Sequence, residues 1–463
     1  NPLIVDAVEA VVPPAANPFS DTALRELVLG GSRALPRRFQ GVFDIVQLPL
    51  TEGYRPIRSG AFSLSEHYGL TVEALHGHLQ MLAPGGILAL TRWLQLPPTE
   101  SLRAGALVVE ALARAGVSQP TEHIVAIRSW STCLILVRRE PFTPEEIETV
   151  RAFCREQGFD LVALPGMAPD EANRYNQLPE PVYYQAFQQL LSASDREAFY
   201  RQQAFDVAPP TDDRHFFFHF FMWRQAPEVL RTLGKTWQPF GGSGYFVLVA
   251  LLVLTLAIGA FLILLPAALA RRTRLAPGRR ARTLLLFGAL GVAFMTVEMP
   301  LLQQFILFLD QPTYAFAVVL FSLLGFSGLG SLISNRAPAG LALAGPALAA
   351  LLLAVGGPLL VHGLLGSPLW LRGVITVLAL APVGLLMGMP FPRAMGALRD
   401  EQTALVPWAW AVNGVASVVG SVLATMLALS WGFTAVFGCG ALAYLAAAGG
   451  AWPLLVSAKI KAR

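Results

Sequence analysis

The chain carries little charge and little cysteine for its length. Asp, Glu, Lys and Arg make up only 14% of its 463 residues, against about 25% in an ordinary soluble protein. Its three cysteines, Cys133, Cys154 and Cys439, have no CxxC or other metal-like spacing. His76 and His78 are two residues apart, which does not bring both rings to one helix face. We therefore expect no metal site. Cys133 and Cys154 could pair only in an oxidising compartment, which the sequence leaves open.

The shortage of charge is confined to one part of the chain. Residues 1–240 hold most of the acids and bases, whereas residues 241–463 contain long runs with almost none. Such a switch marks a boundary between water and lipid. We expect a soluble domain at 1–240 and a transmembrane domain at 241–463, with the lipid bilayer as a partner. The net charge of +4 arises in loops beside the apolar segments, so it indicates membrane topology and no nucleic-acid partner.

Strand-like and helix-like segments alternate in the soluble part. This alternation predicts an α/β fold with a mostly parallel sheet. The last two strands flank a polar Ser-Trp-Ser turn and are expected to form an antiparallel hairpin. The aromatic run Phe216–Phe221 is expected to lie against the membrane or to pack on the membrane helices, and a buried strand is the alternative. The predicted strands are 42–48, 87–91, 123–127 and 133–137, and the predicted helices are 71–82 and 102–115.

Seven apolar stretches follow, each near or above the ~20 residues needed to cross about 30 Å of hydrocarbon. Glycine and proline are frequent inside them, as is common in membrane helices. Small residues within 325–331 and 414–421 are expected to let neighbouring helices approach closely. The sequence predicts an all-α bundle of about seven transmembrane helices, at 244–269, 283–308, 313–334, 339–364, 369–389, 406–430 and 433–456.

Basic residues in the short loops predict the orientation of this bundle. Arg372 stands alone on one side, and the positive side is cytoplasmic. An odd number of crossings then places the soluble domain outside and the C-terminus in the cytoplasm of a multi-pass protein of the cytoplasmic membrane. The residues on the positive side are Arg271, Arg272, Arg274, Arg279, Arg280, Arg282, Arg336, Arg393, Arg399, Lys459, Lys461 and Arg463.

Seven short segments resemble one protein family along nearly the whole chain. The family is that of the spermidine synthases (polyamine aminopropyltransferases), and in particular its bacterial membrane branch, in which the synthase-like part is fused to transporter-like helices. The resemblance implies a Rossmann-like domain of the methyltransferase type in the soluble part. The matching segments are Phe43–Val46, Ser59–Tyr68, Pro84–Leu88, Thr211–Arg214, Glu298–Leu301, Gly388–Pro392 and Trp408–Gly414.

The resemblance also implies that this domain is incomplete at its N-terminus. The chain begins Asn1-Pro2 without a Met or a signal peptide, which we expect of a fragment or a processed product. The first strand, the Gly-rich loop and the acid that holds the donor's ribose in the family would lie upstream of Asn1. The cofactor-binding residues are therefore unknown. The next acid, which contacts adenine, aligns with Gly31 or Ser32, and neither residue has a carboxylate.

In the soluble synthases two aspartates three residues apart follow the strand that corresponds to Phe43–Val46. One holds the aminopropyl donor and the other deprotonates the attacking amine, as a general base must because a protonated amine is not a nucleophile. The corresponding positions here are Pro49 and Glu52. Pro49 removes the donor-side acid. Glu52 is the candidate catalytic base, and the alternative is a solvated loop residue after a strand.

Three polar residues within the apolar stretches are candidates for a polar membrane site. Glu298 is followed by Pro300 and Gln303, and Asn413 lies in a later stretch. An ionisable group at this depth usually faces a partner or a water-filled cavity. The alternative is hydrogen bonding between helices without a substrate.

Paired carboxylates precede the aromatic run. Asp212 and Asp213 could bind a cation or a polyamine amine, or they could form salt bridges with Arg214 and cap a turn, which we favour. Asp310 and His362 lie near predicted helix ends and are expected to be interfacial.

Two functions remain open. The first is an aminopropyltransferase or methyltransferase that uses S-adenosylmethionine or its decarboxylated form, with Glu52 as the base. The second is a non-catalytic accessory, scaffold or transporter-like component of the membrane, which needs no cofactor. The missing and replaced acids, Pro49 and the expected external location favour the second. The first requires an upstream segment or another membrane subunit to supply the missing strand and acid.

Overall fold

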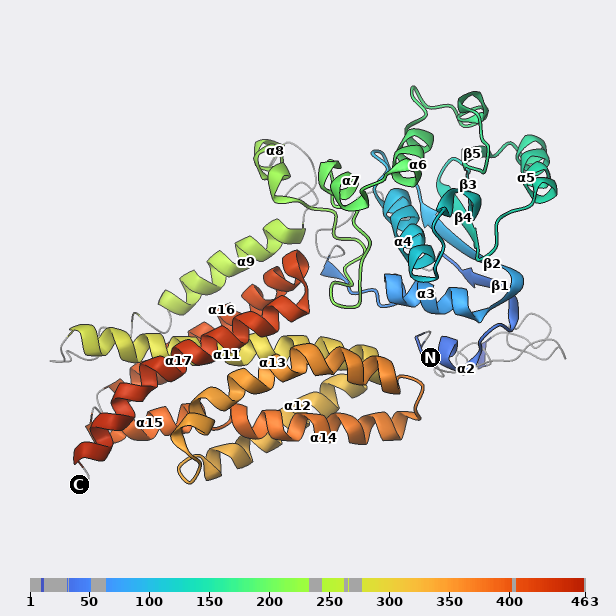
Figure 1. Cartoon of the computed structure of the whole chain (residues 1–463). Coiled ribbons are helices and arrows are strands. Elements are labelled where there is room, and N and C mark those ends of the chain that lie inside the picture. The colour runs from blue at the N-terminus through green and yellow to red at the C-terminus, as the bar shows by residue number, and fades with distance from the viewer. Residues whose placement is uncertain are drawn as a thin grey trace.

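The computed structural model shows an α/β part and a bundle of long helices, which lie against each other (Figure 1). The described elements with known bounds run from α2 (Leu35–Arg38) to α17 (Phe433–Lys461). The structure describes residues 10–11, 31, 33–50, 64–232, 244–261, 265, 277–401 and 405–461.

The α/β part contains a mixed sheet of five described strands in the order β1-β2-β4-β3-β5. The pair β1–β2 is parallel, and the pairs β2–β4, β4–β3 and β3–β5 are antiparallel. The predicted hairpin is confirmed as β3–β4, but the prediction of a mostly parallel sheet is wrong for the described strands. The hairpin sits inside the sheet, next to β2 and β5, and hairpin strands are necessarily antiparallel. The strands are β1 (Phe43–Leu48), β2 (Leu82–Trp93), β3 (Ile124–Arg128), β4 (Thr132–Arg138) and β5 (Asp160–Ala163).

Helices cover both faces of this sheet. Successive residues of β3 alternate between two apolar clusters, as the period of a strand requires: Ile124 packs under α4, and Val125 packs under α5. The helix α5 begins with a capping box between Thr143 and Glu146, which satisfies backbone N–H groups at its start. The helices are α3 (Val72–Met81), α4 (Glu100–Arg114), α5 (Pro144–Gln157), α6 (Val182–Ser192), α7 (Arg196–Gln202) and α8 (Ala226–Thr232).

The second strand starts earlier than the sequence predicts. Its expected start is residue 87, after Pro84–Gly86, but β2 runs through these residues from Leu82. A Cβ on Gly86 would lie 2.8 Å from the Phe43 carbonyl oxygen. Glycine is therefore required here because β1 passes directly beside this backbone.

Six of the described helices are long and apolar enough to cross a membrane, so the chain is a multi-pass membrane protein. The first predicted stretch contains α9 (Gly244–Gly259), which at 16 residues is about 24 Å long. Most of the remainder of that stretch lies outside the described residues, so a count of seven stays a prediction. The long helices are α11 (Pro277–Leu309), α12 (Pro312–Ile333), α13 (Ala339–Leu364), α14 (Leu369–Met387) continued by α15 (Pro390–Glu401), α16 (Val406–Trp431) and α17.

The helix α11 forms the centre of the bundle and packs mainly on α16 and α17. Two of the predicted small-residue contacts are present: a Cβ on Gly420 would lie 3.0 Å from the Cα atom of Val292, and a Cβ on Gly330 would overlap the Leu385 backbone. Around Gly325, Gly328 and Gly414, in contrast, there is open space. Small residues therefore permit close backbone approach at two points of the predicted segments and not along their length.

Candidate functional site

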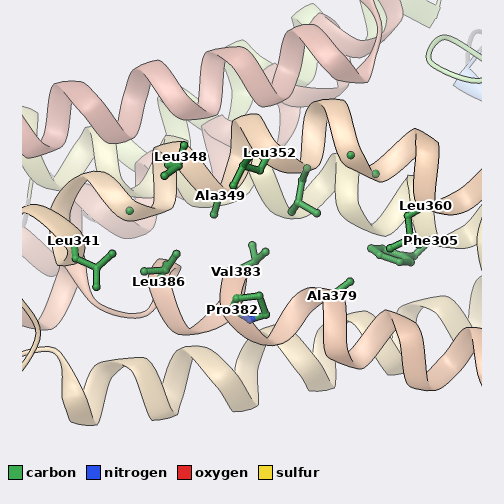
Figure 2. A pocket seen from close by; sticks show the side chains of 14 residues that line it. Phe305, Leu341, Leu348, Ala349, Leu352, Leu360, Ala379, Pro382, Val383 and Leu386 are labelled. Carbon is green, nitrogen blue, oxygen red and sulfur yellow. The ribbon is translucent and has the colours of Figure 1, made fainter.

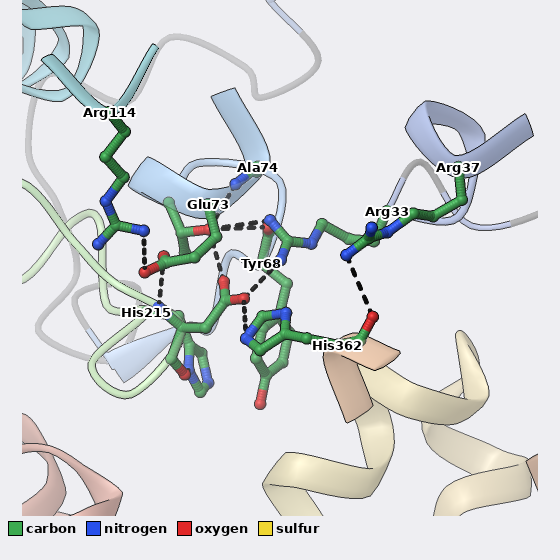
Figure 3. Close-up of polar contacts among 10 residues, drawn as sticks. Arg33, Arg37, Tyr68, Glu73, Ala74, Arg114, His215 and His362 are labelled. Carbon is green, nitrogen blue, oxygen red and sulfur yellow. Dashed lines mark hydrogen bonds and ion pairs between the residues drawn. The ribbon is translucent and has the colours of Figure 1, made fainter. Parts of the chain in front are cut away.

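A polar contact joins the α/β part to the ends of the membrane helices, with Asp212 at its centre (Figure 3). Asp212 pairs with Arg33 at 2.5 Å and accepts a hydrogen bond from the Thr71 hydroxyl at 2.6 Å. Its carboxylate also lies 3.5 Å from Nε2 of His362 at the end of α13, and its backbone N–H donates to Glu73 at 3.0 Å. We call these five residues the Asp212 cluster. The carboxylate of Asp212 thus has three side-chain partners, and one of them, His362, belongs to a membrane helix. Asp212 therefore holds the α/β part against the helical bundle.

The neighbouring Asp213 attaches the same loop to another helix. Its Oδ1 atom accepts hydrogen bonds from the backbone N–H and the hydroxyl of Thr434, at 2.8 and 2.7 Å. Its carbonyl oxygen accepts from the backbone N–H of Phe433 at 3.0 Å. These bonds satisfy donors at the start of α17. The expected salt bridge from Arg214 goes instead to Asp206, at 3.3 Å.

A second polar group, the Glu66 cluster, lies beside the first and consists of Glu66, Tyr68, His215 and Gln303. The Tyr68 hydroxyl donates to the Gln303 carbonyl oxygen on α11 at 2.6 Å. The His215 ring stacks on Tyr68 with centroids 3.7 Å apart, and its Nε2 atom lies 4.0 Å from the Glu66 carboxylate. This cluster therefore connects the α/β part to a helix that crosses the membrane.

Burial sets the protonation of the Glu66 cluster. It lowers the pKa of His215 to about 3, so the ring is neutral at pH 7. Nδ1 of His215 lies 3.1 Å from the Asp212 carbonyl oxygen, which requires the proton on Nδ1 and leaves the Nε2 lone pair toward Glu66. Burial also raises the pKa of Glu66 to about 7, against the opposing effect of a hydrogen bond from Gln303. Glu66 can therefore gain or lose a proton near neutral pH.

Glu298 and Gln303 lie on the same helix, α11. They are five residues apart, which is about 7.5 Å along the axis. Glu298 is buried, with 8% of its surface exposed, and lies within electrostatic range of Tyr444 on α17. Among the described residues no hydrogen bond or ion pair reaches its carboxylate.

Asn413 lies away from these two residues. Its side-chain amide donates to the Phe287 carbonyl oxygen at 3.1 Å, joining α16 to α11. Phe287 and Gln303 are separated by about 24 Å along α11. Glu298 and Gln303 point about 140° apart around α11. The structure therefore does not gather the three candidates into one site, and Asn413 belongs to a separate interhelical contact.

The positions expected to hold a donor and a base are described only in part. The candidate base Glu52 lies outside the described residues, as does Ser32. Pro49 is described and follows β1 directly, so the donor-side position has no carboxylate. A Cβ on Gly31 would overlap the Asp310 side chain, which leaves no room for an acid at that adenine position.

A metal centre has no support in the described part of the chain. Among those residues no group of three or more His, Cys, Asp or Glu side chains could hold a metal ion. Cys133 and Cys154 are buried in different apolar clusters, on the two faces of the sheet, and do not form a disulfide.

One buried arginine had no clear signal in the sequence. Arg103 on α4 is 1% exposed and donates to the carbonyl oxygens of Phe217 and His219 at 2.6 and 2.8 Å. The aromatic run is not a strand, and Arg103 satisfies backbone groups that a strand would pair in a sheet. Its side chains divide between the two parts: Phe217 packs in the α/β core, and Phe216 packs against α9, α16 and α17. The expectation that the run packs on the membrane helices is confirmed for Phe216.

Comparison with protein-family models, with curated proteins and with solved structures finds no match to this chain.

Proposed function

We propose that the protein is a multi-pass component of a bacterial cytoplasmic membrane. In this proposal the α/β part is a non-catalytic domain of the spermidine synthase type, and it caps a transporter-like or scaffold-like helical bundle on the outer side. The observation that carries the proposal is the Asp212 cluster. Asp212 belongs to one of the segments that resemble the family, and its carboxylate holds Arg33, Thr71 and His362.

The residues at two expected donor positions argue against an S-adenosyl donor. The donor-side position is Pro49, and the adenine position falls at Gly31 or Ser32. Asp212 and Asp213 are both engaged with the membrane helices. No described carboxylate is therefore left for the ribose or for the aminopropyl group of a donor at these positions, and we derive no transfer step.

The arrangement of helix ends supports the external location of the cap. Asp212 contacts the end of α13, and Asp213 contacts the start of α17. Arg393 on α15 donates to the carbonyl oxygens of Ser334 and Ala337 at 2.6 and 2.7 Å, and α15 lies at the end of the bundle far from the α/β part (Figure 1). The rule that basic loops remain in the cytoplasm then favours an external α/β part, where S-adenosyl compounds are scarce.

One observation favours the transferase as a second candidate. The pKa of Glu66 is about 7 because of burial, and a general base works best with a pKa near the working pH. Glu66 lies in a segment that resembles the family, so it could take a proton from an amine if a donor were bound by residues outside those described.

Calorimetry separates the two candidates. The protein with its native upstream sequence is titrated with S-adenosylmethionine and with its decarboxylated form. We expect no binding. Micromolar binding of either compound would overturn the non-catalytic proposal. Glu52→Gln and Glu66→Gln, which replace candidate bases, would then lose the transfer reaction, and Asp170→Asn, at an exposed surface pair with Arg174, is the matched control.

A further inference from the structure

An apolar slot of about 350 Å³ separates α13 from α14 within the membrane-spanning part (Figure 2). Its α13 wall follows one helix face from Leu341 to Leu360, and its α14 wall runs from Ala379 to Leu386. The helix α14 packs more closely on α12 than on α13, which leaves the space open. Glycines widen it: a Cβ on Gly356 would meet no atom within 4 Å.

We propose that this slot binds one acyl chain of a membrane phospholipid. Its walls are entirely apolar side chains and glycines. A water molecule there would have no hydrogen-bond partner in the walls, and a polar solute would lose its hydration without compensation. The amide of Gln304 lies behind Gly357 and is not part of the wall.

The shape and the opening identify the occupant. The α13 wall from residue 341 to 360 is about 28 Å long, close to the ~30 Å thickness of the hydrocarbon layer. A helix of that length and about 10 Å in diameter would occupy roughly 2,000 Å³, so the slot is too small for a helix of a partner or of a second copy. Leu348 and Leu352 at its edge are 59% and 64% exposed. The slot is thus continuous with the surface that contacts lipid, and a single chain can enter from the bilayer.

A photolabelling experiment tests this site. The protein is reconstituted in vesicles of phosphatidylethanolamine and phosphatidylglycerol that contain a phosphatidylcholine with a photoactivatable group in its acyl chain. After irradiation, labelled peptides are mapped by mass spectrometry. We expect the label to concentrate on residues 341–360 and 379–386.

Two variants make the test specific. Gly356→Leu fills the slot and is expected to reduce labelling there by about fivefold or more, because it removes most of the space that the chain needs. Gly363→Leu is the control, since Gly363 lies on the same helix in open space but does not line the slot. If Gly356→Leu does not fold, Gly345→Ala takes its place; its Cβ would meet the flexible Leu386 side chain at 2.9 Å and narrow the slot. Labelling spread evenly over exposed residues such as Phe321 and Leu332, or unchanged by these variants, would overturn the proposal.

Discussion

At the scale of single residues, the Glu66 cluster holds a carboxyl group whose protonation changes near neutral pH. Glu66 is partly covered by His215 and Gln303, and its side chain remains 25% exposed. The His215 ring cannot compensate a negative charge, because burial lowers its pKa to about 3. Ionising Glu66 in the folded protein therefore costs free energy that the unfolded chain does not lose.

The pH dependence of stability tests this arrangement. The folded-state pKa of Glu66, about 7, lies above its ordinary value of 4.5. The contribution of Glu66 to the free energy of unfolding is therefore fully present below pH 4.5, and it is lost as the pH rises through 7. We expect Glu66→Gln to be more stable than the wild type at pH 8, by on the order of 2 kcal/mol, and close to it at pH 4.5. Thermal unfolding in detergent at both pH values measures the difference, and an equal effect at the two values would show that Glu66 does not titrate in this range.

The sequence points to the acids of the contact between the α/β part and the membrane helices, but it does not predict the residues with which they pair. Thr211–Arg214 is recognisable as a motif, whereas Arg33 is separated from Asp212 by 179 positions. No local pattern connects two such residues, since the fold alone brings them together. The position of Glu298 inside an apolar stretch is visible in the sequence, but its neighbour Tyr444 on α17 is not.

At the scale of elements, the periodicity of apolar residues predicts where helices and strands lie better than it predicts which strands pair in the sheet. The hairpin β3–β4 follows from its polar turn. Its insertion between β2 and β5 depends on contacts between distant segments, so the mixed sheet does not follow from local patterns. The aromatic run is predicted only in part: Phe216 packs on the membrane helices as expected, whereas the buried-strand alternative is wrong, because Arg103 on another element supplies hydrogen bonds to its backbone.

An ion pair connects the C-terminal end of α11 to the first turn of α14, and its contribution to stability can be tested. Arg372 donates to the Phe308 carbonyl oxygen at 2.6 Å and pairs with Asp310 at 2.8 Å, and both side chains are largely buried. We expect Arg372→Ala to destabilise the protein by about 3 kcal/mol, because it leaves the Asp310 carboxylate without its partner. Arg155→Ala, which breaks an exposed pair with Glu148, should have little effect. Thermal unfolding of the two variants compares them, and equal losses would contradict the structural role of Arg372.

At the scale of the whole molecule, the charge distribution and the contact between the two parts lead to the same arrangement. The sequence predicts the change from water to lipid near residue 240 and the positions of six long helices. The contact itself could not be predicted, because its residues come from loops of the α/β part and from the ends of helices far along the chain. The proposed function depends on the side of the membrane on which this contact lies.

Cysteine labelling in intact cells tests that location most directly. The background is Cys439→Ser, which keeps the buried Cys133 and Cys154. A membrane-impermeant maleimide is applied to Glu156→Cys, on the exposed surface of α5, and to Asn335→Cys, in the exposed loop between α12 and α13. We predict that Glu156→Cys is labelled in intact cells and Asn335→Cys only after lysis. The reverse pattern would place the α/β part in the cytoplasm and contradict the proposal of an external, non-catalytic cap.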